Sequence, residues 1–261
     1  MSIHPSAIIE DGAEIGAGCS IGPFCHVGNS VKLAEGVRLH SHVAISGDTE
    51  IGARTEIWPF ASIGSQPQDL KFAGEHTRLV IGAQNMIREG VSINPGTAGG
   101  GGITEIGDNN LFMLGTHVGH DCRIGNRVVV ANHASMAGHV EVGDGAVIGG
   151  LAGIHQFVRI GEGAIIGALS MVVADVIPYG SVIGERPKLA GLNLIGLKRR
   201  GVSRSEISAL RMAYKALFSG EGTLKTRAEA LMESADGALE TQLLSFVLSD
   251  SERSFTTPKA K

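Results

Sequence analysis

Large aromatic side chains are scarce in this chain, because phenylalanine, tyrosine and tryptophan together make up only 4% of its 261 residues. An interior filled by bulky rings is therefore excluded, although the 43% hydrophobic content is enough for an aliphatic core. Long apolar runs are missing too, and no charged segment followed by an apolar one opens the chain. We therefore expect no membrane span and no secretory signal, and we expect a cytoplasmic protein.

Concentrated positive charge is another absence. The formal net charge is −4, and the basic residues are scattered apart from one cluster, Lys198-Arg199-Arg200. A nucleic-acid-binding surface requires a basic patch, so nucleic acid is excluded as a partner. The three cysteines, Cys19, Cys25 and Cys122, are an odd number without the spacing of a metal site. We expect them to be buried packing residues.

What the chain does contain is a six-residue repeat together with 38 glycines. An α-helix has a period of about 3.6 residues and a flat strand a period of 2, so neither explains a sixfold pattern. Short strands joined by tight corners explain it, since three hexads form one triangular coil of eighteen residues with aliphatic side chains stacked inside. The pattern predicts a left-handed parallel β-helix, and its first aliphatic positions are Ile9, Ile15, Ile21, Val27, Leu33, Leu39, Ile45, Ile51, Ile57 and Ile63.

Two interruptions and a change of character divide the chain. The repeat lapses after Ile63 and resumes in phase at Ile81, one full coil later, and a Gly-rich stretch shifts the phase by one residue before Ile106. We expect loops near 65–78 and 94–102. After residue 186, Ser203 and Glu206 form a capping box ahead of a helical apolar pattern, and 222–235 and 237–250 also have helical patterns. We therefore assign 1–186 to the β-helix and 187–261 to a small helical domain.

Histidines suggest where chemistry occurs. His120, His139 and His155 are nineteen and sixteen residues apart, so successive coils bring them together, and His117 lies three residues before His120. An imidazole titrates near neutrality and can accept a proton from a hydroxyl or an amine. Asp121 is a candidate to orient His120, although adjacent side chains of a strand point in opposite directions. The backbone of Gly138 is a candidate oxyanion donor.

The chain resembles the UDP-N-acetylglucosamine acyltransferases, which act first in lipid A assembly, over essentially its whole length. The segments that carry the resemblance are Ser62-Ile63-Gly64, Pro67-Gln68-Asp69-Leu70-Lys71, His117-Val118-Gly119-His120-Asp121-Cys122, Ala137-Gly138-His139-Val140, Ile154-His155-Gln156-Phe157, and 193–201, which ends Gly-Leu-Lys-Arg-Arg-Gly.

The resemblance implies that His120 is the general base and that Gly138 donates its N–H to the oxyanion. The residues that it implies for the substrate groove are Gln68, Asp69, Lys71, His117, His139, His155 and Gln156. Asn193, Arg199 and Arg200 would hold the nucleotide and its phosphates. The implied acceptor is a UDP-amino sugar. The donor is an (R)-3-hydroxyacyl group on the phosphopantetheine of acyl carrier protein, an acidic partner, and no other cofactor or metal is implied.

The resemblance also implies a homotrimer with active sites between subunits. Asn94-Pro95 stands where many members have His-Arg, and Ile195 replaces an acidic residue of some members, so the atom acylated at the sugar's 3-position, oxygen or nitrogen, stays open. Ala168 matches the position that limits acyl length, where some members have glycine. We expect a slightly shorter acyl chain than those glycine members use.

Two other readings are kept. A zinc enzyme of the γ-carbonic-anhydrase type would use His117, His120 and His139 as ligands on the same fold. A non-catalytic structural β-helix would have flat, regular faces, against which the two predicted loops and the histidine column argue.

Overall fold

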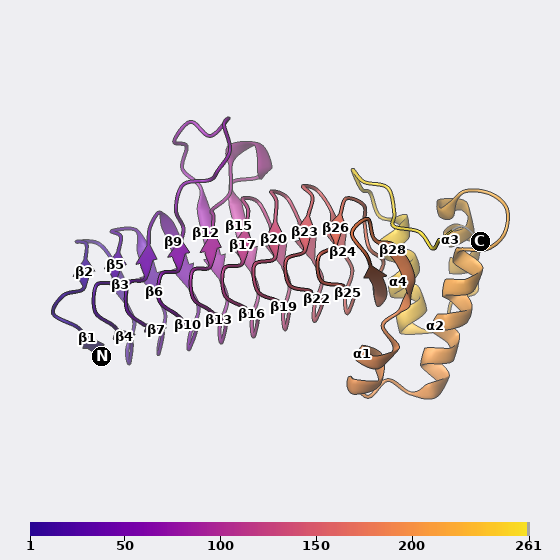
Figure 1. Ribbon diagram of the computed structural model, residues 1–261, viewed down its shortest axis with the longest axis horizontal. Helices are drawn as coiled ribbons and strands as arrows, with labels where there is room; N and C mark the ends of the chain where they lie inside the picture. Colours follow the sequence, from indigo (N-terminus) through magenta and orange to yellow (C-terminus); the bar gives the residue numbers. More distant parts are fainter. Residues whose placement is uncertain (260–261) are drawn as a thin grey trace.

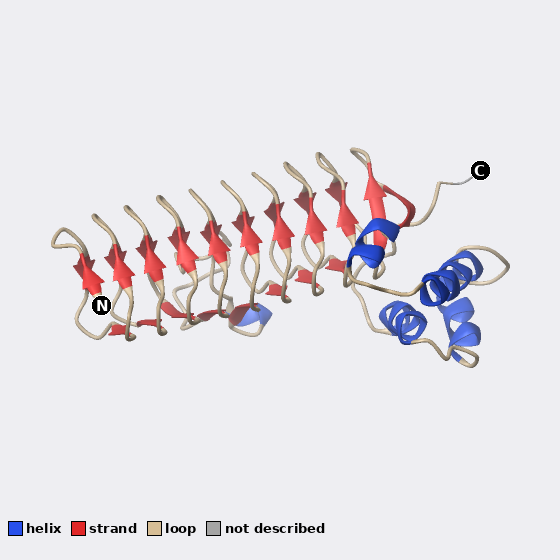
Figure 2. Cartoon of the chain, turned by 90° about the horizontal axis from the view of Figure 1, so that it is seen from below, coloured by secondary structure: helices blue, strands red, loops and turns tan. Residues whose placement is uncertain are grey.

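The computed structural model describes residues 1–259 as a three-sided coil of short strands followed by a group of helices (Figure 1). The amino terminus lies at the free end of the coil, and the helices lie beyond its other end. Viewed from below, the strands of one side form a regular row in which each strand lies beside its equivalent in the next coil (Figure 2).

Within residues 1–259 the strands form three sheets, which we call A, B and C. Sheet A has eleven strands, and all but the last pair are parallel: β1 (Ser2–Ile3), β4 (Ser20–Ile21), β7 (Arg38–Leu39), β10 (Glu56–Ile57), β13 (Met86–Ile87), β16 (Leu111–Phe112), β19 (Val129–Val130), β22 (Val147–Ile148), β25 (Ile165–Ile166), β27 (Gly180–Ile183) and β28 (Lys188–Leu192).

Sheet B has nine parallel strands in the described chain: β2 (Ile8–Ile9), β5 (His26–Val27), β8 (Ala44–Ile45), β11 (Ser62–Ile63), β14 (Ser92–Ile93), β17 (His117–Val118), β20 (Ser135–Met136), β23 (Gly153–Ile154) and β26 (Met171–Val172). Sheet C has eight over the same range: β3 (Glu14–Ile15), β6 (Val31–Leu33), β9 (Asp48–Ile51), β12 (Arg78–Ile81), β15 (Ile103–Ile106), β18 (Arg123–Ile124), β21 (Glu141–Val142) and β24 (Arg159–Ile160).

The core is the column of aliphatic side chains that the repeat predicts. Val27 pairs with Ile45, and Ile45 with Ile63, each eighteen residues further along the chain. All three side chains are buried. The cysteines are buried as predicted, and each thiol donates to a backbone carbonyl of the next coil, as Cys25 does to His40. Apolar area removed from water stabilises each coil, at about 25 cal/mol per Å².

The three edges of the coil are named by the sheets that they join. The chain turns from sheet A to sheet B at the AB edge, from B to C at the BC edge, and from C to A at the CA edge. Both predicted loops leave the BC edge, since they lie between β11 and β12 and between β14 and β15. Figure 1 shows them projecting from the same side of the coil.

The register of strand pairing gives the number of residues that each loop adds. Ile51 pairs with Ile81, thirty residues apart rather than eighteen, so the first loop adds twelve residues. The expectation that the repeat resumes one full coil after Ile63 was wrong, because Ile81 lies in the next strand along the chain, β12. The phase is nevertheless kept, because the twelve added residues are a multiple of the six-residue repeat. Ile81 pairs with Ile106, twenty-five apart, so the second loop adds seven and shifts the phase by one. It contains a short 3-10 helix, η1 (Ala98–Gly100).

The helices are α1 (Leu194–Arg199), α2 (Arg204–Leu217), α3 (Leu224–Met232) and α4 (Ala238–Leu248) within the described residues. The predicted capping box is present, because Ser203 accepts from the N–H of Glu206 and the Glu206 side chain accepts from Ser203. The helical patterns near 222–235 and 237–250 are confirmed as α3 and α4. Helix α1 was not predicted. Over residues 1–259, every helix falls short of the length and apolarity needed to cross a bilayer.

Candidate active site

One corner position of the BC edge holds Asp121, His139 and Phe157 in three successive coils. All three residues have positive φ, of 59°, 61° and 64°, which turns the chain sharply. The His139 ring stacks on Phe157 with centroids 4.3 Å apart, and His120 meets His139 edge-on at 5.1 Å. Residues eighteen apart in sequence are thus vertical neighbours here, and His120 joins them because it precedes Asp121.

His120 is paired with a buried carboxylate. Its Nδ1 lies 2.7 Å from Oδ2 of Asp121, and the Asp121 side chain has no exposed surface. The two side chains do not point in opposite directions, as those of adjacent strand residues do, because both residues lie in a corner rather than in a strand. Since a carboxylate accepts hydrogen bonds, Nδ1 carries the proton and Nε2 keeps its lone pair.

The second loop holds this carboxylate in place. The N–H of Thr97 donates to Oδ1 of Asp121 at 2.8 Å, and its hydroxyl donates to Oδ2 at 2.6 Å. The N–H of Asp121 donates to the Thr104 hydroxyl at 2.8 Å. A Cβ on Gly100 would lie 2.0 Å from Cγ of Asp121, so only glycine fits there. Thr97, Thr104 and Gly100 were not predicted, and the one signal for them was the glycine run after Pro95.

The imidazole of His120 lies directly over the backbone of Gly138, one coil further along. A Cβ on Gly138 would come within 2.4 Å of His120 Cε1 and 2.6 Å of its Nε2. The Gly138 N–H donates to no acceptor within residues 1–259. A free backbone donor and a basic nitrogen therefore face the same space.

That space is a groove on the sheet B side of the BC edge. Six of the predicted site residues line it together with Asn94: Gln68, His117, His120, Gly138, His155 and Gln156. His117 Nδ1 lies 2.8 Å from the Ser92 hydroxyl. Burial, with a smaller contribution from His120, holds the pKa of His117 below its ordinary value, so this imidazole favours the neutral form.

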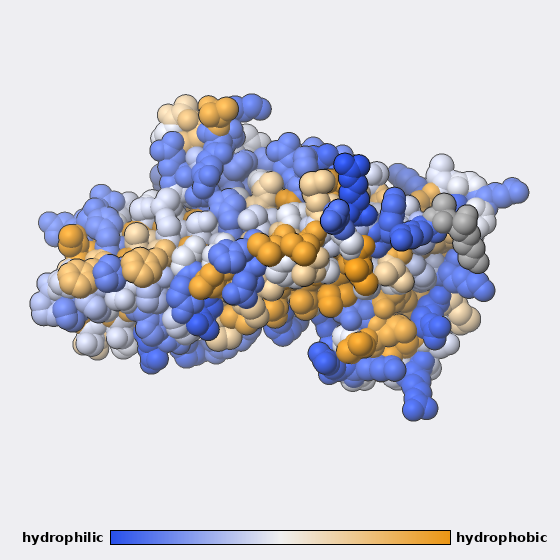
Figure 3. All heavy atoms as spheres, in the orientation of Figure 1, coloured by the Kyte–Doolittle hydropathy of each residue, from blue (hydrophilic) through white to orange (hydrophobic). Residues whose placement is uncertain are grey.

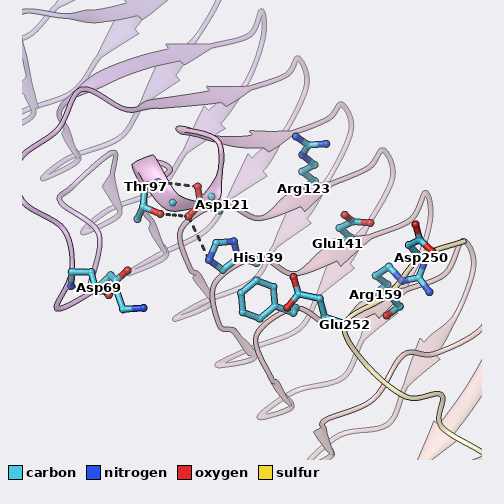
Figure 4. Close-up of a pocket in the computed structure, with 14 residues that line it drawn as sticks. Asp69, Thr97, Asp121, Arg123, His139, Glu141, Arg159, Asp250 and Glu252 are labelled. Atoms are coloured by element: carbon cyan, nitrogen blue, oxygen red, sulfur yellow. Dashed lines mark hydrogen bonds and ion pairs between the residues drawn. The ribbon is translucent and has the colours of Figure 1, made fainter.

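A second depression lies on the sheet C side of the same edge. Asp69, Lys71, Asp121 and His139 line it with Glu252 from the end of the chain (Figure 4). The dashed lines in Figure 4 join Asp121 to Thr97 and to His139, whose Nε2 is 3.8 Å from the Asp121 carboxylate. Burial is the main cause that lowers the pKa of His139. The predicted groove residues thus flank the edge from both sides.

The remaining predicted residues lie elsewhere on the chain. Asn193 caps α1 by accepting from Gly196 N–H, and it also donates to the carbonyl of Gly163. Arg200 forms an ion pair with Glu162 at 3.0 Å and donates to a corner of the CA edge, the carbonyl of Gly145, at 2.9 Å.

Arg199 is exposed at the end of α1, and Ala168 is exposed on the AB edge. One chain therefore carries the predicted residues on three different edges.

Over residues 1–259 of one chain, the three histidines of the zinc reading do not converge. In the described part of the chain, the group of three or more histidines and acids whose ligand atoms all lie within 4.8 Å of one another is His120, Asp121 and His139, and His117 is not part of it. Asp121 already accepts from His120 and twice from Thr97.

A triangular parallel coil that carries a histidine–carboxylate pair beside a groove defines the class: a hexapeptide-repeat acyltransferase. A family model described as Udp N-acetylglucosamine O-acyltransferase, Domain 2, matches residues 175–256. The acyl-acyl-carrier-protein–UDP-N-acetylglucosamine O-acyltransferase of Caulobacter vibrioides is 52% identical over 260 residues, 99% of each chain. That of Paracoccus denitrificans is 57% identical over 201 residues, 77% of this chain and 76% of its own.

Solved structures agree with these relatives. A crystal structure of UDP-N-acetylglucosamine acyltransferase superposes with a TM-score of 0.96 at 44% identity over 100% of both chains. The enzyme from Campylobacter jejuni gives 0.93 at 38% identity, covering 99% of this chain and 100% of its own. The chain belongs to the family of acyl-acyl-carrier-protein–UDP-N-acetylglucosamine O-acyltransferases. The resemblance and the predicted left-handed parallel β-helix are confirmed.

Proposed function

We propose that this acyltransferase moves an (R)-3-hydroxyacyl chain from acyl carrier protein to the 3-position of UDP-N-acetylglucosamine, or of its 3-amino analogue, as the first step of lipid A biosynthesis. The names of its relatives supply the two substrates. The observation that carries the mechanism is the 2.7 Å contact of His120 with buried Asp121, which leaves Nε2 free above Gly138.

The chemistry follows from these positions. Nε2 of His120 accepts the proton of the sugar's 3-hydroxyl or 3-amine, whose oxygen or nitrogen attacks the thioester carbonyl. The resulting oxyanion accepts a hydrogen bond from the Gly138 N–H. When the intermediate collapses, the carbon–sulfur bond breaks and His120 returns the proton to the departing phosphopantetheine thiolate. Asp121 holds the ring in the required tautomer and stabilises it while it is charged.

Substrate binding would use both sides of the BC edge. Gln68, His117, His155 and Gln156 flank His120 in the groove of sheet B. Asp69, Lys71 and His139 approach from the other side. Hydrogen-bond donors and acceptors in this number suit a sugar with several hydroxyl groups.

The complete site would need more than one copy of the chain. Arg200 contacts the CA edge and Ala168 lies on the AB edge, whereas His120 lies on the BC edge. Side chains on different edges of a prism can serve one substrate when a second copy packs alongside, so we infer a homotrimer with sites between subunits. Exposed Leu151, Leu169 and Met171 would be covered by such contacts. Figure 3 shows hydrophobic surface along the coil towards the helices.

Acyl carrier protein would dock through electrostatic attraction to a basic surface. Lys198, Arg199 and Arg200 are exposed next to one another at the end of α1, and acyl carrier protein is acidic. The acyl chain would arrive on its phosphopantetheine, and His120, Asp121 and Gly138 perform the transfer without a further cofactor. A substrate made in the cytoplasm would place the enzyme there.

One assay tests this proposal. Purified protein is incubated with UDP-N-acetylglucosamine, or its 3-amino analogue, and hydroxyacyl carrier proteins of several chain lengths, and the products are weighed by mass spectrometry. We expect acylation of one sugar with a defined chain length, in the presence or absence of a chelator. Failure of every pair of substrates to react would refute the proposed function, and loss of turnover on chelation would favour a metal enzyme.

The trimer has its own test. Subunits carrying His120→Ala are co-expressed with subunits carrying Arg199→Ala. If a site takes His120 from one subunit and Arg199 from the next, the mixed oligomers regain part of the activity that both parents lack. Activity no higher than that of the parents would show that both residues act within one chain.

A further inference from the structure

The end of the chain returns to the coil as a strap, residues 249–257. The N–H of Asp175 donates to the Ser254 carbonyl at 2.8 Å, and the N–H of Thr256 donates to the Asp175 carbonyl at 2.8 Å. Leu189 in β28 donates to the carbonyl of Thr257 at 3.0 Å. The strap therefore continues the pairing of the coil after α4. In Figure 1 it is the yellow segment near β24 and β28.

A buried ion pair fixes the strap beside the groove. Asp175 has no exposed surface, and its Oδ2 lies 2.7 Å from Nε of Arg159. The Ser251 hydroxyl donates to the same oxygen at 2.7 Å. The Arg159 guanidinium also lies 4.5 Å from the centroid of the Phe246 ring in α4. A satisfied buried network of this kind gives the segment one fixed position.

From this strap Arg253 reaches the groove. Its Nη2 lies 2.9 Å from Nδ1 of His155, and its Nε donates to the carbonyl of Gln156 at 3.0 Å. His155 and Gln156 both line the groove with His120. The fork of the guanidinium therefore holds the corner that lies one coil beyond Gly138.

This contact decides which nitrogen of His155 carries the proton. A guanidinium has only donors, so Nδ1 of His155 must offer its lone pair and the ring proton stays on Nε2. The Gln156 carbonyl is 3.3 Å from the same Nδ1, but this oxygen accepts from Arg253. His155 thus has the opposite tautomer to His120, whose Nδ1 donates to Asp121.

We propose that Arg253 is a positioning residue for acyl transfer: it holds His155 as the Nε2–H tautomer, so that the groove presents a hydrogen-bond donor beside the basic nitrogen of His120. The donor would bind an oxygen of the sugar-nucleotide acceptor. In this respect the inference rests on the proposed function, although the tautomer itself does not.

Nitrogen NMR of protein labelled at histidine tests the tautomer without any substrate. In the wild-type protein we expect the His155 proton on Nε2. In Arg253→Ala the proton should move towards Nδ1, where the Gln156 carbonyl can accept it. A wild-type His155 with its proton on Nδ1, or a spectrum that Arg253→Ala leaves unchanged, would overturn the inference even if acyl transfer were established.

Kinetics test the consequence. Arg253→Ala should raise the KM for the sugar nucleotide about tenfold with a smaller change in kcat, since it disturbs binding rather than the base. Arg253→Lys should recover part of the loss. In a His155→Ala background the same substitution should add less than about twofold. An equal effect in both backgrounds would show that Arg253 acts without His155.

Two controls separate this role from attachment of the strap. Arg186→Ala removes an exposed arginine that lies near residues 254–257 of the strap but does not line the groove, and it should leave KM unchanged. Ser251→Ala removes the hydroxyl that donates to Asp175 and accepts from the Arg253 N–H, while Arg253 keeps its side chain. If Ser251→Ala raised KM as much as Arg253→Ala and shifted the His155 tautomer no less, loosening of the strap would explain both, and the specific role of Arg253 would be refuted.

Discussion

Two edges of the coil carry similar stacks of rings at the same corner position. On the AB edge His42 lies between Phe24 and Phe60, with both ring centroids 5.0 Å away. On the BC edge His139 stacks on Phe157 and meets His120. A histidine stacked at a left-handed corner is therefore a packing solution that the fold uses more than once, and such a column is not by itself a catalytic site.

What differs is the acid beneath the imidazole. Phe24 occupies on the AB edge the corner position that Asp121 occupies on the BC edge. The two long loops leave the BC edge, and the second brings Thr97 onto the carboxylate. Corners of the AB edge connect their strands by short turns. A loop that buries a carboxylate beside the imidazole is therefore what distinguishes the BC edge from the AB edge.

The largest effect should come from removing the imidazole on one edge but not on the other. His120→Ala should lower kcat by about a thousandfold, because a positioned general base contributes roughly 10²- to 10⁴-fold. His42→Ala, the matched change on the AB edge, should leave turnover close to wild type. Steady-state assays with both substrates check this pair, and turnover of His120→Ala near wild type would mean that another group is the base.

The next largest effect should come from removing the charge of the BC corner, because the AB corner has no charged residue at this position. Asp121→Asn keeps the volume but offers an amide to His120, so it should favour the wrong tautomer and lower kcat by about a hundredfold. KM should change little, since the amide does not reach the groove. If the variant melted normally and retained full kcat, the carboxylate would be only structural.

The loop that buries Asp121 can be tested through two adjacent glycines. An added methyl at Gly100 would lie 2.0 Å from Cγ of Asp121, whereas at Gly99 it would meet nothing within 4 Å. Gly100→Ala should lower kcat on the order of tens-fold by displacing the carboxylate, and it should lower the melting temperature. Gly99→Ala is the control and should behave as wild type. If the two variants behaved equally, the loop would have no part in holding Asp121 against His120.

A change on the AB edge should affect which hydroxyacyl donor the enzyme prefers, and not its turnover rate. Ala168 is exposed there, and Ala168→Gly removes one methyl group. We expect the ratio of kcat/KM for longer to shorter hydroxyacyl donors to rise about tenfold, as for one methylene in an apolar pocket. Competition between donors, read by mass spectrometry of the product, measures this. An unchanged or shortened preference would remove Ala168 from the acyl site.

The smallest effect concerns stability against pH. Burial lowers the pKa of His117 and of His139 from the ordinary 6.5, so below that pH the unfolded chain takes up protons that the folded chain resists. Stability should therefore be complete above about pH 6.5 and fall as the pH decreases towards the lower folded values. His117→Asn and His139→Gln should each flatten the fall in melting temperature between pH 7 and 5.5. A steeper fall in either variant would contradict the sign.

The architecture was predictable because its signal is repeated. The aliphatic side chains of the column keep one phase up to the second loop, so Ile9, Val27 and Ile45 report the same geometry. The start of α2 was predictable because Ser203 and Glu206 act over three residues. Local or periodic interactions of this kind leave a pattern in the sequence.

The site was less predictable because its contacts are neither local nor periodic. Thr97 reaches Asp121 across twenty-four residues through an irregular loop, and Arg253 reaches His155 across ninety-eight. No spacing rule connects such pairs. The contact of Asp121 with His120 was underestimated because a rule for strands was applied to a corner, where φ is positive.

The most direct test of the account is to locate the proton on His120 by nitrogen NMR of the protein labelled at histidine. A general base at Nε2 requires the proton on Nδ1, donated to Asp121, and a bare lone pair on Nε2 in the groove. It also requires that Asp121→Asn weakens this preference. A proton found on Nε2 in the wild-type protein would leave no basic nitrogen above Gly138 and would contradict the account.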